Sequence, residues 1–465
     1  MNTPGRLEQP LNFQWSVEAG PLKPMMKNWR DMRKIGWEYI PGTSANILSI
    51  SPYNWSPAYC IPHPWNWRHL ENLVKFTHKK GLKAYPYLTP STINEYYVFD
   101  LNAKYYDFPP SPKRPPILRK KADSIPVKEY QYNAYDWPTL PIRKIGDGSS
   151  IETNDMVWID TGSSYADYFV WSIRELLRKS DLDGIYLDLV VPQLDFNPRK
   201  NLTSKTRDGI VEGTRRHFAF RNMFKRLYYV FLELRPKERK PYMLLHAIPS
   251  MNVSQFSDLL FYGENLSVPN LFDYTKIYKS EGLYRNYHSS IGRSVKSNYD
   301  FLSYRSIFNH SSGSPMMFLP QYGICRRNDY WRDDLTREIL AFIMVHDTLL
   351  WATNIKNPPV FRFWEKVTIP YGMGNSIFHG YWENGIKSKP ASVRCSYYSK
   401  QNCEDYLLVI GNFDDKANTA EIVLPAVMQK LPAVDQENGK AIEHDANLKV
   451  KIPAHDLRVI RFQKK

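Results

Sequence analysis

Cysteine, long apolar runs and metal-binding spacings are scarce in this chain. Its 465 residues include four cysteines, too few for a disulfide framework at this length. No segment holds 18 consecutive apolar residues, which argues against a transmembrane helix. The 11 histidines are scattered, with no His-x-x-x-His or Cys-x-x-Cys pair. We therefore expect neither a metal nor another cofactor.

Signatures of several protein classes are also missing. No Gly-rich loop follows the first predicted strand, which argues against a nucleotide-binding fold, and no Gly-x-Ser-x-Gly elbow points to a serine esterase. Zinc-finger spacings and aromatic-basic RNA-binding signatures are absent, so we expect no nucleic-acid partner. The first ten residues contain no apolar h-region of a secretory signal. Two localisations stay open: a cytoplasmic protein, or an exported one of which this chain is a fragment or processed form.

Aromatic residues and positive charge are, in contrast, abundant. The chain contains 32 Tyr, 22 Phe and 13 Trp, and its net charge is +15. Rings with a polar group suit sites that hold sugars, although an aromatic-rich core is an equally good interpretation. A basic protein attracts anionic partners such as nucleic acid, anionic lipid, or sulfated and uronic polysaccharides. With nucleic acid disfavoured, an anionic carbohydrate is the partner that we expect.

Short apolar runs alternate with amphipathic helices over most of the chain, which is the pattern of parallel βα units. Apolar residues from Leu70 to Thr77, for example, line one side of a helix that ends at Gly81, and an apolar strand follows at once. Strands are predicted at 13–17, 45–50, 82–88, 185–189, 242–246, 259–264, 315–320 and 349–351. Eight units predict an α/β fold with a (β/α)8 (TIM) barrel, and a doubly wound open sheet is the alternative.

Two regions depart from this pattern. A Pro-rich, basic stretch at about 100–155 follows a predicted strand, so we expect a loop on the catalytic face, either solvated or contacting substrate. Beyond about residue 370, short strands separated by turns predict a small antiparallel β-sandwich. We therefore expect a barrel domain over 1–370 and a sandwich domain over 371–465. Cys395 and Cys403 flank a predicted hairpin tip, where free thiols are favoured over a disulfide.

Acidic side chains end two of the predicted barrel strands. Asp188 ends the fourth strand, and Glu264 ends the sixth, directly after Gly263. In a TIM barrel, side chains at the carboxyl ends of strands point into the active site. Two carboxyl groups that converge there are the minimal equipment for cleaving a glycosidic bond. The alternative is that each carboxylate pairs with a neighbouring arginine or caps a helix.

Further side chains near strand ends are candidates for binding substrate. His246 ends the fifth strand and is suited to a hydrogen bond with a sugar hydroxyl or a catalytic carboxylate, although a core histidine is an equally good interpretation. The aromatic candidates are Trp55, Tyr87 and Tyr186. The candidate contacts for carboxylate or sulfate groups are Arg216 and Arg326, with solvated surface arginine as the alternative.

Several motifs resemble glycoside hydrolase family 123. They are Gly20-Pro21-Leu22-Lys23-Pro24, His78-Lys79-Lys80-Gly81-Leu82-Lys83, Asp183-Gly184-Ile185-Tyr186-Leu187-Asp188, Lys225-Arg226-Leu227-Tyr228, and Ser257-Asp258 ahead of Gly263-Glu264. Characterised members of that family use an adjacent Asp-Glu pair, and the substrate's N-acetyl group acts as nucleophile. Here Leu189 follows Asp188, so the pair is absent. The arrangement is more similar to the wider group of barrel glycosidases with a nucleophilic Asp on the fourth strand.

These observations favour a glycosidase that acts on an anionic poly- or oligosaccharide, of which sulfated saccharides are one kind. We expect a retaining mechanism, with Asp188 as nucleophile and Glu264 as acid/base. An inverting or substrate-assisted glycosidase on the same barrel is an alternative. A non-catalytic glycan-binding barrel is a second alternative, from a different class of protein.

Overall fold

The computed structural model describes residues 22–51, 55, 62–64, 66–94, 156–195, 204–205, 209, 211–234, 241–247, 252–263, 301–308, 310–320, 333–401 and 404–464. Eight parallel strands form a closed ring in the order β1-β14-β13-β12-β11-β6-β3-β2. They are β1 (Lys34–Ile35), β2 (Ile47–Ile50), β3 (Lys83–Leu88), β6 (Gly184–Leu187), β11 (Tyr242–His246), β12 (Leu259–Tyr262), β13 (Met316–Phe318) and β14 (Leu349–Ala352). The predicted (β/α)8 barrel is therefore confirmed.

The first strand of the ring is not the one that the sequence predicts. β1 pairs with both β2 and β14 and so closes the barrel at Lys34–Ile35. The predicted opening strand, 13–17, lies outside the described residues, and the ring is complete without it. The prediction that 13–17 opens the barrel is therefore wrong. Asp188 still follows the fourth strand of the ring, because β6 occupies that position.

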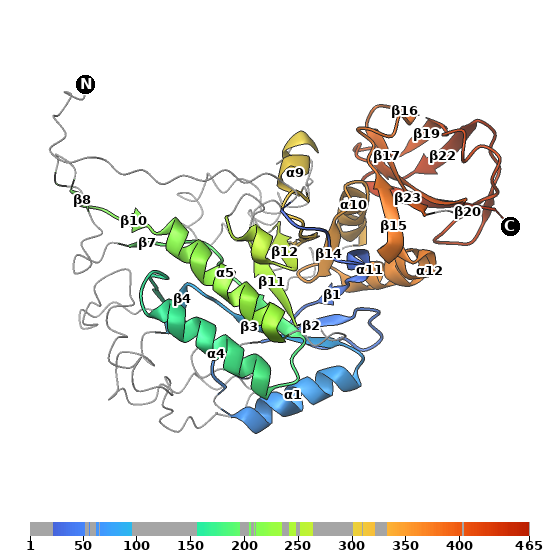
Figure 1. The fold of residues 1–465 in the computed structure, drawn as a ribbon. Coiled ribbons are helices and arrows are strands. Elements are labelled where there is room, and N and C mark those ends of the chain that lie inside the picture. The colour runs from blue at the N-terminus through green and yellow to red at the C-terminus, as the bar shows by residue number, and fades with distance from the viewer. Residues whose placement is uncertain are drawn as a thin grey trace, which may run out of the picture.

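Amphipathic helices surround the ring. The helices between strands include α1 (Trp67–Lys79), α4 (Tyr165–Lys179), α5 (His217–Leu234), α9 (Phe301–Ile307) and α10 (Asp333–Met344), and α11 (Asn357–Phe363) follows β14. Asn66 caps α1 by accepting a hydrogen bond from the backbone N–H of His69, and Gly81 ends the turn with φ +73°. α4 and α5 lie side by side on the outside of the barrel (Figure 1).

The C-terminal part contains two antiparallel sheets. A six-stranded sheet has the order β15-β17-β18-β23-β20-β21, and a three-stranded sheet has the order β16-β19-β22. The strands are β15 (Ser376–His379), β16 (Lys387–Lys389), β17 (Val393–Lys400), β18 (Asp405–Asn412), β19 (Asn418–Val423), β20 (Ala433–Asp435), β21 (Ala441–Ile442), β22 (Asn447–Ile452) and β23 (Asp456–Gln463). Side chains from both sheets meet in one apolar cluster. This is the predicted β-sandwich.

The central strand β18 is buried on both of its faces. Leu408 and Ile410 belong to the cluster between the two sheets. Leu407 and Val409 belong instead to the large cluster that extends into the barrel helices, including α10. This is why the strand reads as a continuous apolar run rather than an alternating one. The six-stranded sheet is therefore a wall that the barrel and the sandwich share, and Figure 1 shows it beside α10.

The sandwich hairpin carries a free thiol. β17 and β18 form the predicted hairpin, with Cys395 opposite Ile410. Cys395 is a buried free cysteine, and burial raises the pKa of its thiol to about 12. Cys403 lies outside the described residues.

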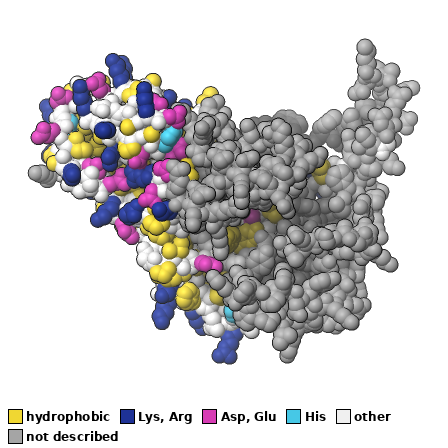
Figure 2. Space-filling model, turned by 180° about the vertical axis from the view of Figure 1, so that it is seen from behind, with side chains coloured by type: hydrophobic (Ala, Val, Ile, Leu, Met, Phe, Trp, Pro, Cys, Tyr) yellow, Lys and Arg dark blue, Asp and Glu magenta, His cyan; other side chains and the backbone are white. Residues whose placement is uncertain are grey.

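The surface of the sandwich carries both signs of charge. In Figure 2, lysine and arginine side chains are interspersed with acidic ones over this lobe. Lys449, for example, forms an ion pair with Glu421 at 2.8 Å across β22 and β19. This face is therefore not a basic patch, and the net charge of +15 is not concentrated on it.

Candidate active site

Asp188 lies directly after β6, at the carboxyl end of the barrel. Its backbone N–H donates to the carbonyl oxygen of Leu88 at 2.8 Å, which ties it to the end of β3. The next residue, Leu189, has φ +52°, a conformation that costs energy for a side chain of this kind. The turn brings the backbone N–H of Leu189 to 2.7 Å from Asp188 Oδ1. The end of β6 thus holds the carboxylate in a fixed orientation.

The strands on both sides of β6 supply donors to the same carboxylate. Tyr87, on β3, donates its hydroxyl to Asp188 Oδ2 at 2.5 Å. His246, on β11, lies with Nδ1 at 2.5 Å from Asp188 Oδ1. Three of the predicted site residues are therefore brought into direct contact. Among them, His246 takes the second of its two predicted roles, as partner of a carboxylate.

The pKa of Asp188 reflects opposing effects. Burial alone raises the pKa of this carboxyl, but the charge and hydrogen bond of His246, the Tyr87 hydroxyl and the Leu189 N–H all lower it. The net result is a pKa below the ordinary value of 3.8. The side chain remains 18% exposed. Asp188 is therefore a partly exposed group that is anionic at neutral pH.

An exposed tryptophan lies beside this group. Trp37 follows β1, is 39% exposed, and packs edge-on against Tyr87 with ring centroids 5.1 Å apart. Its ring also contacts Tyr186 and Trp351 deeper in the barrel, at 6.1 and 5.8 Å. An exposed indole next to a carboxylate is a suitable platform for a sugar ring. The strand-end rule would have identified Trp37, had β1 been recognised at Lys34–Ile35.

A lysine lies inside the barrel below this tryptophan. Lys34 has no exposed surface, and its Nζ lies 3.0 Å from the centroid of the Trp351 ring. The Tyr186 and Phe261 rings lie 5.3 and 5.4 Å from the same atom. Burial lowers the pKa of Lys34 well below its ordinary value. Within the described ranges no carboxylate forms an ion pair with it.

Two of the predicted aromatic platforms are core residues. Tyr186 is 1% exposed and packs against Phe261 and Trp351 in the barrel interior. Trp55 has no exposed surface and belongs to the main hydrophobic cluster. A ring without exposed surface offers no face to a sugar, so the structure contradicts these two assignments. Tyr186 lies one inward-facing position before Asp188 on the same strand, which places it a layer deeper.

The remaining predicted residues fall into two groups. Arg216 donates to Asp160 Oδ2 at 3.0 Å, and its side chain is 36% exposed. The Arg216 guanidinium is thus already paired with a carboxylate. Glu264 and Arg326 lie outside the described residues. Gly263, the residue before Glu264, is described; it follows β12 and has φ +135°. This positive φ is strained for other residues, and a Cβ would also lie 3.0 Å from the Leu319 carbonyl oxygen and the Phe318 ring, so glycine is favoured at this position.

Neither a metal centre nor a membrane-spanning helix is found among the residues that the structure describes. In this part of the chain, no three His, Cys, Asp or Glu side chains converge as metal ligands would. Among the described helices, none has the length and hydrophobicity needed to span a bilayer.

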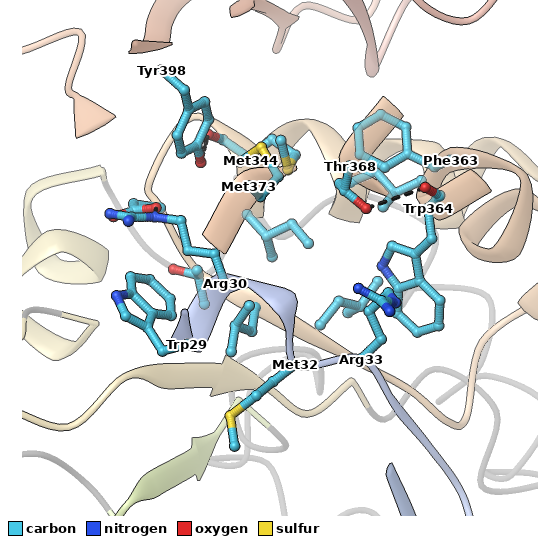
Figure 3. Close-up of a pocket in the computed structure, with 16 residues that line it drawn as sticks. Trp29, Arg30, Met32, Arg33, Met344, Phe363, Trp364, Thr368, Met373 and Tyr398 are labelled. Atoms are coloured by element: carbon cyan, nitrogen blue, oxygen red, sulfur yellow. Dashed lines mark hydrogen bonds and ion pairs between the residues drawn. The ribbon is translucent and has the colours of Figure 1, made fainter. Parts of the chain in front are cut away.

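A small cavity lies at the other end of the barrel (Figure 3). Its volume is about 40 Å³, too small for a sugar ring. Arg30 at its edge stacks on Trp29 at 4.3 Å and binds Asp347 through two hydrogen bonds of 2.6 and 2.7 Å. Arg30 also donates to the carbonyl oxygen of Ser376 in β15 at 2.7 Å. The surroundings of this cavity join the start of the barrel to the sandwich.

The ring of eight strands and the two packed sheets define the class of this protein, a (β/α)8 barrel followed by a β-sandwich. No protein-family model matches the chain, and no curated protein sequence matches it. Solved structures of the same class do match.

Three of these structures cover nearly all of the chain. A maltogenic α-amylase from Thermotoga neapolitana is 10% identical, with 94% of this chain and 100% of that chain covered and a TM-score of 0.52. A family 27 β-L-arabinopyranosidase from Geobacillus stearothermophilus is 11% identical, with 94% and 97% covered and a TM-score of 0.52. An isomalto-dextranase from Arthrobacter globiformis is 9% identical, with 97% and 76% covered and a TM-score of 0.50. At these identities the likeness establishes the fold.

Proposed function

We propose that this protein is a glycoside hydrolase. The observation that carries the proposal is the state of Asp188: a partly exposed carboxylate at the end of a barrel strand, held anionic by donors from both neighbouring strands. No arginine or lysine in the described part of the chain pairs with it. Among the described residues, the partner of Asp188 is His246, and the ion pair with arginine that is the main structural alternative for a strand-end carboxylate is not seen.

Two further observations support the proposal. The three similar structures are, by their names, enzymes that act on carbohydrates, and they share this barrel and sandwich. The exposed ring of Trp37 lies against Tyr87, which itself holds Asp188. A sugar placed on the indole would present its ring atoms close to the carboxylate.

In the proposed mechanism, Asp188 is the nucleophile and Glu264 the acid/base of a retaining reaction. Glu264 protonates the leaving oxygen while an Asp188 oxygen attacks the anomeric carbon, so the glycosidic bond breaks and a glycosyl ester forms. Glu264 then takes a proton from water, the water attacks the anomeric carbon, and Asp188 leaves as a carboxylate. The low pKa of Asp188 keeps it ionised for the first step. Oδ2, with Tyr87 as its donor, is the less heavily hydrogen-bonded oxygen.

We further propose an anionic saccharide, sulfated or uronic, as substrate, since the chain carries a net charge of +15. Distant kinship with glycoside hydrolase family 123 is part of the same proposal. A substrate-assisted mechanism of that family competes with the retaining one, but position 189, next to Asp188, is leucine rather than a second acid. An inverting mechanism and a non-catalytic glycan-binding barrel also compete with it, and the products of the reaction distinguish all of these.

The test combines activity with trapping of the nucleophile. The protein is screened on 4-nitrophenyl glycosides, including glucuronides and sulfated sugars, and on sulfated and uronic oligosaccharides. Asp188→Asn is expected to lower kcat/KM on the best substrate by at least about three orders of magnitude. The matching 2-deoxy-2-fluoro glycoside with a good leaving group is expected to label Asp188, as read by peptide mass spectrometry.

The control is Asp181→Asn. Asp181 precedes the same strand at the opposite end, and its side chain is 64% exposed, so this variant should keep near-normal activity. Near-normal turnover by Asp188→Asn would refute the assignment of the nucleophile. A product whose anomeric configuration is inverted, as seen by NMR, would replace the retaining mechanism with an inverting one. Binding of glycans without turnover of any substrate would favour the non-catalytic glycan-binding barrel.

A further inference from the structure

A second, larger cavity lies at the end of the barrel opposite to Asp188. Its volume is about 330 Å³, at the lower end of the range for sites that hold small molecules. α9 contributes Tyr304 and Arg305 to its wall, and the segment after α10 contributes His346. Because these segments lead into the starts of β13 and β14, they lie at the amino ends of the strands. Phe378 and Trp382 of the sandwich region form the other wall.

Arg305 is the basic group in the wall of this cavity. Its guanidinium stacks over the Trp382 ring at 4.2 Å, and within the described residues it has no carboxylate partner. Two other arginines at the junction between barrel and sandwich are paired with carboxylates. Arg30 binds Asp347, and Arg337 binds Asp456 at 2.7 Å and Glu437. A stacked guanidinium with unused donors is suited to bind a carboxylate or sulfate.

The tryptophan under Arg305 is held in place by its neighbours. Phe378 and Tyr381 contact the Trp382 ring at 5.7 and 5.0 Å, and His346 stacks on it at 6.2 Å. A Cβ on Gly380 would lie 2.5 Å from the same ring, so glycine is required for this packing. The aromatic wall is therefore preorganised, which lowers the entropic cost of binding a ligand.

The remaining polar groups leave the cavity with a net positive charge. Asp347 is neutralised by its two hydrogen bonds with Arg30. His310 lines the cavity as well, but both of its ring nitrogens are buried, and Nε2 lies 3.9 Å from Asp347 Oδ2. Burial lowers the pKa of His310, so its imidazole adds no positive charge at pH 7.

We infer that this cavity is a second, non-catalytic saccharide site, which binds one acidic sugar unit with its carboxylate or sulfate on Arg305. The apolar faces of the sugar pack against the aromatic wall. The choice of a saccharide as ligand rests on the proposed function, whereas the anion specificity rests on Arg305 alone. Such a site would hold part of a polymeric substrate away from the catalytic end.

The test uses four probes: D-glucuronate, glucose 6-sulfate, D-glucose and inorganic sulfate. Each is titrated against the full-length protein by ligand-observed NMR, and crystals soaked in each probe show where it binds. Both acidic sugars are expected in the cavity, and D-glucose is not. Arg305→Gln should weaken acidic sugar binding there about tenfold or more, which is the size of effect expected for one charged contact. It should leave hydrolysis of a small aryl glycoside unchanged.

Arg394→Gln is the matched control. Arg394 also stacks on two rings, Phe301 and Tyr381, but does not line the cavity, so this variant should bind both acidic sugars as the unaltered protein does. An empty cavity in all soaks, or equal affinity of Arg305→Gln and Arg394→Gln, would overturn the inference. So would equal binding of D-glucose, or sulfate binding as tightly as glucose 6-sulfate. These results do not depend on turnover, so failure of the catalytic proposal would be seen separately.

Discussion

The interiors of the barrel and of the sandwich differ in polarity. Inside the barrel lie Lys34 and the tyrosines Tyr85 and Tyr186, below the carboxylate of Asp188. The Tyr85 hydroxyl is buried without a hydrogen-bond partner in the described part of the chain, and burial raises its pKa. Between the two sheets of the sandwich, in contrast, the buried cluster consists of aliphatic residues, Phe462 and Cys395. Buried hydroxyls without a hydrogen-bond partner, such as that of Tyr85, therefore lie inside the barrel, whereas a buried polar side chain of the sandwich such as Asn412 is hydrogen-bonded. The apolar cluster between the sheets contributes stability.

Among substitutions that test this comparison, one in the sandwich core is expected to have the largest effect. Leu408 is fully buried between the sheets, so Leu408→Ala should lower the free energy of unfolding by about 2–5 kcal/mol through lost burial and a cavity. Urea denaturation measures this loss. Leu302→Ala on α9, where the side chain is 66% exposed, is the control and should change stability little. Equal losses in both variants would contradict the assigned role of the core.

The second effect concerns the partner of Asp188. Burial raises the pKa of Asp188, and His246 is the largest of the influences that lower it, so His246→Phe should raise that pKa. Because activity needs the carboxylate, the acid limb of the kcat/KM profile should move to higher pH. At its optimum the variant should lose about 10²-fold in kcat.

The same variant alters stability with pH. A carboxyl with a lowered pKa stabilises the fold above its unfolded pKa, and this contribution is lost as pH falls through the folded pKa. His246→Phe should therefore unfold at a higher pH on acidification than the unaltered protein. His246→Asn keeps a hydrogen-bond donor without the positive charge. The pH at which it unfolds should lie between those of His246→Phe and the unaltered protein. An unchanged acid limb in both variants would show that His246 does not set the charge of Asp188.

The third effect is a gain in stability. Lys34 has a lowered pKa in the folded state, so the unfolded state binds more protons between that pKa and about 10.5. In this window the contribution of Lys34 disfavours folding, and the penalty shrinks as pH rises. Lys34→Met should raise stability by about 1–3 kcal/mol near pH 7 and flatten the rise of Tm with pH. A lower Tm at pH 7 would mean that the aromatic rings around Lys34 stabilise its charged form.

The smallest effect is expected at the barrel mouth. Trp37→Ala removes the exposed ring beside Tyr87, so KM on an active glycoside should rise about tenfold, while kcat changes less. Trp171, on α4, is exposed to a similar degree at 37%, and Trp171→Ala should leave KM unchanged. Equal KM values for the two variants would remove Trp37 from the substrate site.

The sequence predicted the parts of the fold that have a strong local pattern. The strand-helix alternation specified seven of the eight barrel strands, and the strand-end rule identified Asp188, His246 and Tyr87. β1 was missed because it has two residues and begins with a buried lysine, which no periodicity favours in a core. Trp37 was missed for the same reason, since its position depends on β1.

The errors at Tyr186 and Trp55 have another cause. Alternation shows which side chains of a strand point inward, but not how deep each layer lies below the barrel mouth. Tyr186 points inward as expected, yet the Trp37 ring lies over it, and it is one inward-facing position deeper than Asp188. Trp55 is buried because it belongs to the main hydrophobic cluster, whose members are far apart in the sequence, and local sequence does not encode such packing.

Because β18 has no solvent-facing side, the two parts of this protein cannot be separated without damage. A fragment that ends near residue 370 would lack Leu407, Val409 and Val459, which pack in the same cluster as α10. A fragment that begins there would expose those three side chains to water. Either piece is expected to aggregate when produced alone. The sandwich thus forms an outer layer of the barrel rather than an independent module. A change to one part must therefore preserve its contacts with the other.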